Sequence, residues 1–174
     1  MIKRNIWCWS FGILASLLSI FLFIEVKLYS EAILYLFYVI MGIYGWFEWK
    51  KDFSDNSEII IQKWGFIVHF KWILICIVGI FSLGYYFSNN SEAVRPYSDA
   101  STTIFSFLAT FMETKKILSS WYFWILINAF SVWLYAERGL FIYSGQMIIF
   151  AILSIVGLLR WMKDYSNNQA DISQ

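Results

Sequence analysis

The sequence contains little of what soluble enzymes and disulfide-stabilised domains need. Its 174 residues include one proline, two cysteines and one histidine, and only 14% of them are charged. Cys8 and Cys76 show no metal or redox spacing, so both are interpreted as packing residues. One histidine allows no Ser-His-Asp set and no HExxH zinc site, and the chain has no GxxxxGK[ST] phosphate loop. We therefore expect no catalytic centre, no metal, no cofactor and no intrinsic ATP motor.

Apolar residues dominate the chain instead. Hydrophobic residues make up 60% of it and aromatic residues 22%, whereas a soluble domain is about half apolar and about a quarter charged. A helix needs about 20 apolar residues to cross a roughly 30 Å hydrocarbon core. Six such runs fill the chain, at about 6–26, 30–49, 66–87, 98–114, 121–138 and 140–161. They predict an all-α integral membrane protein with one transmembrane domain over residues 1–165 and a polar cytoplasmic tail at 166–174.

Basic residues predict the orientation in the bilayer. With six spans, both termini and the loops after the second and fourth helices share one side. That side holds nine basic residues, namely Lys3, Arg4, Lys50, Lys51, Lys63, Lys115, Lys116, Arg160 and Lys163. The other side holds Lys27, Arg95 and Arg138. The positive-inside rule therefore places both termini in the cytoplasm, and the net charge of +1 leaves no basic excess for nucleic acid.

A weak internal repeat is visible in the chain. Shifting the sequence by 115 positions aligns six identical residues, including Trp9 with Trp124 and Gly42 with Gly157. Six matches over about 40 apolar residues could arise by chance, but matched tryptophans favour a duplication. The predicted copies are repeat 1 at about 6–50 and repeat 2 at about 98–162, joined by a linker helix at about 66–87. Because their starts lie four spans apart, the repeats are parallel, as in some transporters.

Polar side chains form stripes on two of the predicted helices. The helix at 98–114 carries, three or four residues apart, Asp99, Thr102, Ser106, Thr110 and Glu113, with Thr103 adjacent. The helix at 121–138 carries, with the same spacing, Trp121, Trp124, Asn128, Ser131 and Tyr135. Hydroxyl stripes can be helix-packing surfaces, and packing is the favoured interpretation for Ser106 and Thr110. Asn128 differs, because a mid-span amide beside indole rings can orient a flat polar ligand.

Other residues are candidates for the same cavity. Trp124 lies a turn deeper than Trp121, for which a role in the interfacial aromatic belt is equally compatible. We expect Tyr35, Trp46 and Gln146 to complete a cavity near the bilayer centre, where the repeats meet. Asp99, at the start of its helix, either caps that helix or takes part in gating.

Three stretches carry a family resemblance: IYGWFEWKKD from Ile43, SDASTTIFSFLATFMETKK from Ser98 and SSWYFWILINAFSVWLYAERGLF from Ser119. Together they resemble the PnuC family of nicotinamide riboside transporters. The most specific motif of this resemblance is the W-x-x-W-I-x-x-x-N pattern that begins at Trp121. The resemblance implies two three-helix bundles joined by a linker helix, a SWEET-like fold and a homotrimer in the bacterial inner membrane. It also implies facilitated diffusion, with the solute trapped by cytoplasmic phosphorylation.

The resemblance also suggests a role for each candidate residue. Trp124 would stack on the base, Asn128 would bind the carboxamide, and the hydroxyls of Thr102, Thr103 and Ser106 would receive the ribose. Two departures stand out: family members usually have seven spans, so the chain begins where their second would, and Tyr35 stands where a glutamine is common. Thiamine or another vitamin is the alternative solute. A non-transporting membrane assembly protein is the alternative of another class.

Overall fold

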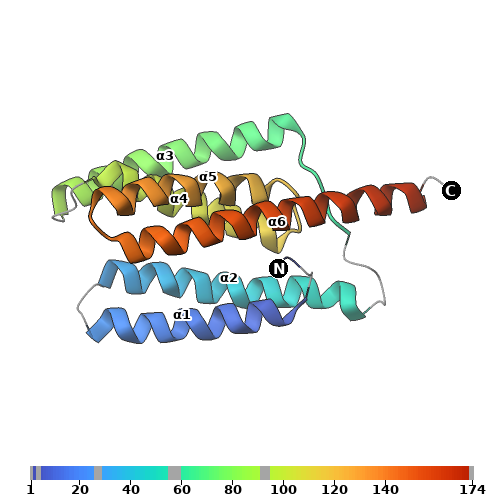
Figure 1. Ribbon diagram of the computed structural model, residues 1–174, viewed down its shortest axis with the longest axis horizontal. Helices are drawn as coiled ribbons and strands as arrows, with labels where there is room; N and C mark the ends of the chain where they lie inside the picture. The colour runs from blue at the N-terminus through green and yellow to red at the C-terminus, as the bar shows by residue number, and fades with distance from the viewer. Residues whose placement is uncertain (1, 3–4, 26–28, 55–59, 91–94, 173–174) are drawn as a thin grey trace.

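The computed structural model describes residues 2, 5–25, 29–54, 60–90 and 95–172. Within them the chain forms six helices, shown in Figure 1: α1 (Trp7–Glu25), α2 (Tyr29–Ser54), α3 (Phe66–Asn90), α4 (Pro96–Thr114), α5 (Ser120–Glu137) and α6 (Phe141–Ile172). The six predicted helices are therefore confirmed. α6 continues through the polar residues after 165, so the described part of the predicted tail is helical. Lys3, Arg4 and Lys27, used for the predicted orientation, lie outside the described residues.

The apolar surface of the helices fits a bilayer. Among the described residues, α3 and the stretch Phe141–Asn167 of α6 are long and apolar enough to span a membrane, with mean hydropathies of 2.2 and 2.1. α1 contains a shorter apolar stretch, Trp7–Leu22. Large apolar side chains on these helices face outward, and Phe66 and Ile142 are 84% and 88% exposed. Exposed apolar area of this extent is unusual for a soluble monomer and suits contact with lipid.

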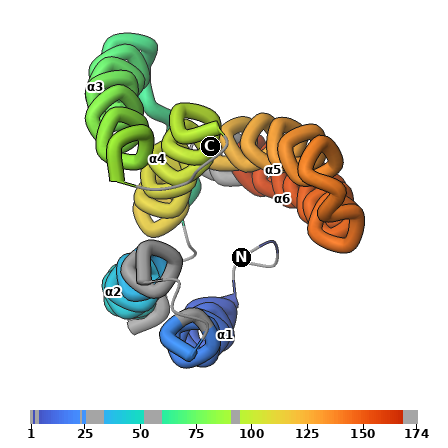
Figure 2. Tube along the Cα trace, turned by 90° about the vertical axis from the view of Figure 1, so that its left-hand side faces the viewer, coloured from blue at the N-terminus to red at the C-terminus, as the bar shows by residue number. Residues whose placement is uncertain are grey.

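The helices form two hairpins, and α4 lies between them. α1 packs on α2, and α5 packs on α6. Figure 2, a view along the helices, shows α4 between the two hairpins, and contacts join it to both α2 and α5. α3 packs on the outside of α4. α4 therefore contacts one helix of each hairpin.

Four buried indole rings close one end of the bundle. We call Trp9, Trp49, Trp121 and Trp161 the tryptophan cluster; the rings are 0–5% exposed and belong to one core. In the first hairpin, Trp9 meets Trp49 edge-on, with centroids 5.6 Å apart and an angle of 83°. In the second, Trp121 meets Trp161 at 5.5 Å and 81°. A tilted contact of 6.3 Å between Trp49 and Trp161 joins the hairpins.

A glycine lies under one ring in each hairpin. A Cβ atom at Gly45 would come within 2.6 Å of the Trp9 ring, and one at Gly157 within 2.4 Å of the Trp121 ring. Only a residue without a side chain permits this approach of ring to helix. A Cβ atom added at Gly42 would likewise come within 2.6 Å of the Ile13 side chain.

These contacts correct the predicted alignment of the hairpins. Trp9 corresponds in its packing to Trp121, and Gly45 to Gly157, which is a shift of 112 positions rather than 115. The predicted pairing of Trp9 with Trp124 is wrong by three residues, nearly one helical turn. The error arose because a shift of one turn keeps apolar residues on the same face.

Basic residues gather at the end of the bundle that holds the tryptophan cluster, which we call the basic end. There Glu48 of α2 binds both Lys51 at 3.0 Å and Lys115, just after α4, at 2.9 Å. Hydrogen bonds to Tyr44 and Glu48 raise the pKa of Lys115. The first cation is one turn away on the same helix, whereas the second follows α4 and links that helix to α2.

Candidate functional site

The predicted site on α5 centres on Asn128, which the structure buries against α6. The side chain is 6% exposed, and its amide nitrogen donates to Ser154 Oγ at 3.2 Å. Ser154 Oγ in turn donates to the carbonyl oxygen of Phe150 at 2.7 Å. The Asn128 carbonyl Oδ1 accepts no hydrogen bond from the described residues. The amide is therefore held in one orientation with an acceptor to spare.

Trp124 lies one turn before Asn128 on the same face of α5 and is half-buried. Its indole nitrogen donates to Glu113 Oε2 at 3.2 Å. Glu113 lies near the end of α4 and is 3% exposed. Sequence reasoning placed Glu113 on the polar stripe of that helix but gave it no role in the site. The signal was its spacing from Thr110, which put a carboxylate on a face that turns inward.

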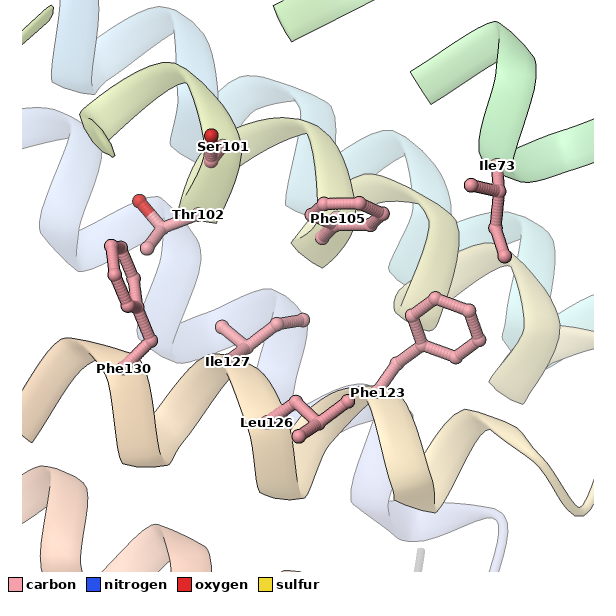
Figure 3. Close-up of a pocket in the computed structure, with 8 residues that line it drawn as sticks. All are labelled: Ile73, Ser101, Thr102, Phe105, Phe123, Leu126, Ile127 and Phe130. Carbon is pink, nitrogen blue, oxygen red and sulfur yellow. The ribbon is translucent and has the colours of Figure 1, made fainter. Parts of the chain in front are cut away.

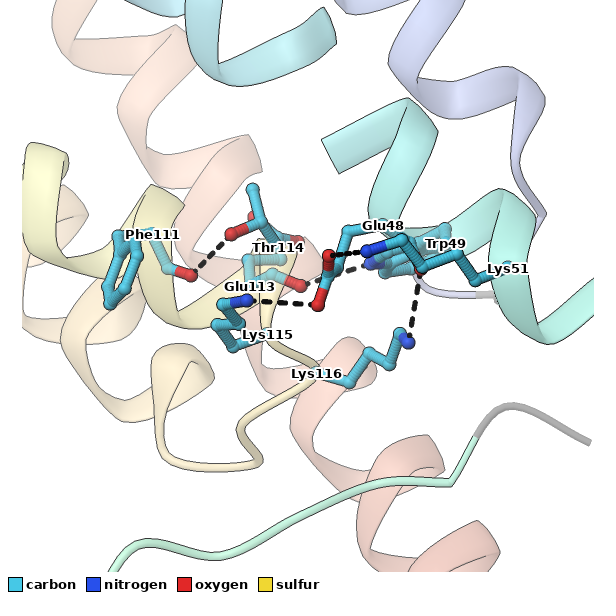
Figure 4. Close-up of polar contacts among 8 residues, drawn as sticks. All are labelled: Glu48, Trp49, Lys51, Phe111, Glu113, Thr114, Lys115 and Lys116. Carbon is cyan, nitrogen blue, oxygen red and sulfur yellow. Dashed lines mark hydrogen bonds and ion pairs between the residues drawn. The ribbon is translucent and has the colours of Figure 1, made fainter. Parts of the chain in front are cut away.

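The same Glu113 also contacts the first hairpin. Its backbone carbonyl oxygen accepts a hydrogen bond from the Trp49 indole nitrogen at 3.3 Å. Figure 4 shows Glu113 and Trp49 beside the ion pair of Glu48 with Lys115. Glu113 thus lies between Trp124 of the second hairpin and the tryptophan cluster.

Hydroxyls on the polar stripe of α4 donate hydrogen bonds to backbone carbonyls of the same helix. Thr102 Oγ1 donates to the Asp99 carbonyl oxygen at 2.9 Å, and Thr110 Oγ1 to the Ser106 carbonyl oxygen at 2.8 Å. Ser106 and Thr110 are both 7% exposed, whereas Thr103 is half-buried. Such bonds satisfy hydroxyls inside an apolar environment, which supports packing for Thr110.

A separate cavity of about 410 Å³ lies between α3, α4 and α5, as Figure 3 shows. Its lining consists of Ile73, Ser101, Thr102, Phe105, Phe123, Leu126, Ile127 and Phe130. The lining is almost entirely apolar, and the hydroxyls of Ser101 and Thr102 bind backbone carbonyls of their own helix. The α5 residues of this lining lie on a different face from Trp124 and Asn128. Of the predicted site residues, only Thr102 lines this cavity.

Several predicted site residues lie elsewhere. Trp121, 5% exposed, belongs to the tryptophan cluster. Tyr135 packs on Tyr143 at 5.9 Å, near the far end of α5. In the first hairpin Tyr35 meets Tyr38 at 5.8 Å, and the half-buried Trp46 meets Trp7 at 5.6 Å. The predicted residues therefore do not form one cluster: Trp124 and Asn128 share one face of α5, and the residues named here pack in other places.

The structure differs from the sequence analysis at two residues, Gln146 and, for the capping alternative alone, Asp99. Gln146 is exposed, so its side chain does not line an interior cavity. It follows the buried Ser144 by two residues, which turns it about 200° around the helix. Asp99 does not cap α4, because the helix begins at Pro96 with Arg95 at the N-cap position. Asp99 binds Arg138 instead, through contacts of 2.8 and 2.9 Å to Nη2.

The fold and this buried polar face first define a class. Amide, carboxylate and indole groups held inside a bundle of apolar helices are typical of membrane proteins that bind or move solutes. The family model described as "Nicotinamide mononucleotide transporter" matches residues 1–163. The chain belongs to this family.

Individual relatives agree with the family. The nicotinamide riboside transporter PnuC of Escherichia coli (strain K12) is 24% identical over 178 aligned residues, covering 87% of this chain and 74% of the relative. The protein of the same name from Shigella flexneri matches to the same extent. The crystal structure of the vitamin B3 transporter PnuC superposes with a TM-score of 0.74 at 20% identity, over 95% of this chain and 75% of that one. These relatives are named as transporters, and the superposition gives the chain the same fold.

Proposed function

We propose that the chain imports nicotinamide riboside across the bacterial inner membrane by facilitated diffusion. The observation that carries the proposal is the buried Asn128, fixed by Ser154 and flanked by Trp124, in a member of this transporter family. Two curated relatives bear the name nicotinamide riboside transporter. A cytoplasmic kinase that phosphorylates the solute would make the flux net-inward without an ATP-binding motif in this chain.

The roles of the site residues follow from their chemistry. Trp124 offers an aromatic face on which the nicotinamide ring stacks. The Asn128 Oδ1 atom accepts a hydrogen bond from the solute carboxamide, since it receives none from the described residues. Thr103 and Ser106 on α4 would supply hydroxyls for the ribose, and contacts from Tyr35 and Trp46 of the first hairpin would require that hairpin to move closer to the site.

The charge of the polar face favours the riboside over its phosphate ester. The acidic side chain that contacts Trp124 on this face is Glu113, whose Oε2 lies 3.2 Å from the indole nitrogen. Lys115 is engaged by Glu48 at the basic end. A phosphate dianion would bring two negative charges beside this buried acidic group, and burying them in a low-dielectric interior is unfavourable whether or not Glu113 is ionised. The family description names the mononucleotide, so this preference is open to direct test.

Three further features belong to the same proposal. The basic end faces the cytoplasm, in accordance with the positive-inside rule. The two hairpins are parallel repeats with a shift of 112 positions, supported by the matched Trp-on-Gly contacts at Gly45 and Gly157.

The chain assembles as a homotrimer, for which the largely unburied α3 supplies apolar surface. Native mass spectrometry of the purified protein in detergent tests the trimer.

The test is uptake of labelled nicotinamide riboside by cells that lack their own importer. Cells expressing the chain should accumulate the label, and unlabelled riboside should compete for uptake. Unlabelled nicotinamide mononucleotide and thiamine should compete poorly. Inhibition by thiamine at lower concentration than by the riboside would assign the protein to another vitamin, and no uptake of any of the three would reject the proposal.

A further inference from the structure

Glu113 is a buried acidic residue to which the proposed function assigns no contact with the solute. Its side chain is 3% exposed and accepts a hydrogen bond from Trp124 Nε1 at 3.2 Å. It forms no ion pair with the described residues. A carboxyl group in the interior of a membrane protein is costly and is retained when it does a specific task. Packing alone would be served better by leucine or methionine.

The position of Glu113 joins two parts of the molecule. Through its side chain it holds the indole of Trp124 on α5. Through its backbone carbonyl oxygen it accepts the indole N–H of Trp49 on α2, at 3.3 Å. Trp49 is fully buried and contacts both Trp9 and Trp161 in the tryptophan cluster. One residue of α4 therefore fixes an indole ring in each hairpin.

We propose that Glu113 is a positioning residue for the solute, which acts by fixing the ring plane of Trp124. The inference rests on the proposed function, in which Trp124 stacks on the nicotinamide ring. An indole side chain has two rotatable bonds, and a solute that stacks on it must otherwise order both. An acceptor on the indole N–H orders them in advance, so less conformational entropy is lost on binding. A carboxyl group suits this task because it offers an acceptor oxygen to the indole N–H, which can only donate.

The inference predicts a graded effect of substitution on affinity. Glu113→Gln keeps a side-chain oxygen that can accept from Trp124, so the Kd for nicotinamide riboside should rise by about threefold or less. Glu113→Leu removes the acceptor and should raise the Kd by about tenfold. Glu137→Leu is the matched control, because this exposed glutamate pairs with Arg95 at the far end of α5 and should leave the Kd unchanged.

A double-substitution cycle separates positioning from a general structural role. Trp124→Phe keeps the aromatic face but has no N–H for Glu113 to hold. In that background Glu113→Leu should weaken binding no further, because the contact it removes is already absent. An equal loss of affinity with and without the Trp124 indole N–H would overturn the inference, as would an unchanged Kd in Glu113→Leu alone. If Glu113→Leu does not fold, the same cycle run with Glu113→Ala and Glu113→Gln decides between these outcomes.

A second readout needs no solute, so it distinguishes failure of this inference from failure of the proposed function. Protein labelled with ¹⁵N at tryptophan gives indole N–H signals, and the signal lost in Trp124→Phe belongs to Trp124. Glu113→Gln and Glu113→Leu should both shift that signal, with the larger shift in Glu113→Leu. If the signal stays in place, Glu113 does not hold the ring, whatever the solute is. If the signal shifts but the parent protein binds no riboside, the contact stands and the assigned solute is wrong.

Discussion

The two hairpins share one end and differ in the middle. At the basic end each buries an indole on a glycine, Trp9 on Gly45 in the first and Trp121 on Gly157 in the second. One to two turns further along, the second hairpin holds the hydrogen bond of Asn128 with Ser154. The comparison supports a structural role for the shared end, and it is the reason why the proposed solute site is assigned to the second hairpin.

Under the proposed repeat, a shift of 112 positions makes this difference specific. It places Ser16 opposite Asn128 and Gly42 opposite Ser154. In the first hairpin a Cβ at Gly42 would meet Ile13 at 2.6 Å, so this level is filled by apolar packing. Trp124 corresponds to Gly12, which has nothing within 4 Å of an added Cβ. The first hairpin thus has neither the amide nor the indole of the proposed site.

The largest expected effect is a loss of stability when the packing of indole on glycine at the shared end is disrupted. Gly157→Ala should place a methyl group against the rigid Trp121 ring, and Gly45→Ala should do the same at Trp9. Each should reduce the stability of the folded protein by about 1–3 kcal/mol, as overpacking does. Thermal unfolding in detergent measures this loss.

Gly145→Ala is the control, since an added Cβ there meets nothing within 4 Å. It should leave the melting temperature unchanged or slightly higher, because alanine favours helix. A normal melting temperature in both Gly45→Ala and Gly157→Ala would show that the indole contacts do not close the bundle.

The next largest effect is expected at Trp124, which has no aromatic counterpart in the first hairpin. Trp124→Ala should weaken binding of nicotinamide riboside roughly 5- to 150-fold, since stacking of a base on an aromatic ring contributes about 1–3 kcal/mol. Trp133→Ala, on an exposed part of the same helix, should bind as the parent does. Isothermal titration measures both. Equal losses from the two substitutions would mean that Trp124 has no special place in the site.

The smallest effect concerns the end of α5 opposite the basic end. Asp99→Asn should weaken the contact with Arg138 and lower stability by about 0–1 kcal/mol, because both side chains are 27% exposed and solvent screens such pairs. Uptake should stay close to that of the parent. A strong loss of uptake at normal stability would assign Asp99 to gating rather than to structure.

The number and position of the helices could be predicted from the sequence because length and hydropathy determine them. Long apolar runs need backbone hydrogen bonds inside the bilayer, and helices supply these. The polar faces of α4 and α5 were also visible, since residues three or four apart share a face. Asn128 was singled out on this basis, and the structure buries it.

The rotation of individual helices could not be predicted in the same way. Gln146 looked suitable as an uncharged polar residue in an apolar run, but the face that α6 turns to α5 depends on packing at Ser144, Ser154 and Gly157. The repeat was misaligned by nearly a turn because its apolar pattern is the same at both shifts. The shift of 112 also matches Glu25 with Glu137 and Asp52 with Asp164, and these charged pairs are the stronger signal.

Equilibrium binding of nicotinamide riboside to purified protein tests the central claim most directly. The parent protein should bind it, Asn128→Leu should show no measurable binding, and Ser16→Ala, at the corresponding place in the first hairpin, should bind as the parent does. All three proteins should unfold at similar temperatures. Undiminished binding by Asn128→Leu would contradict the assignment of the solute site to the second hairpin.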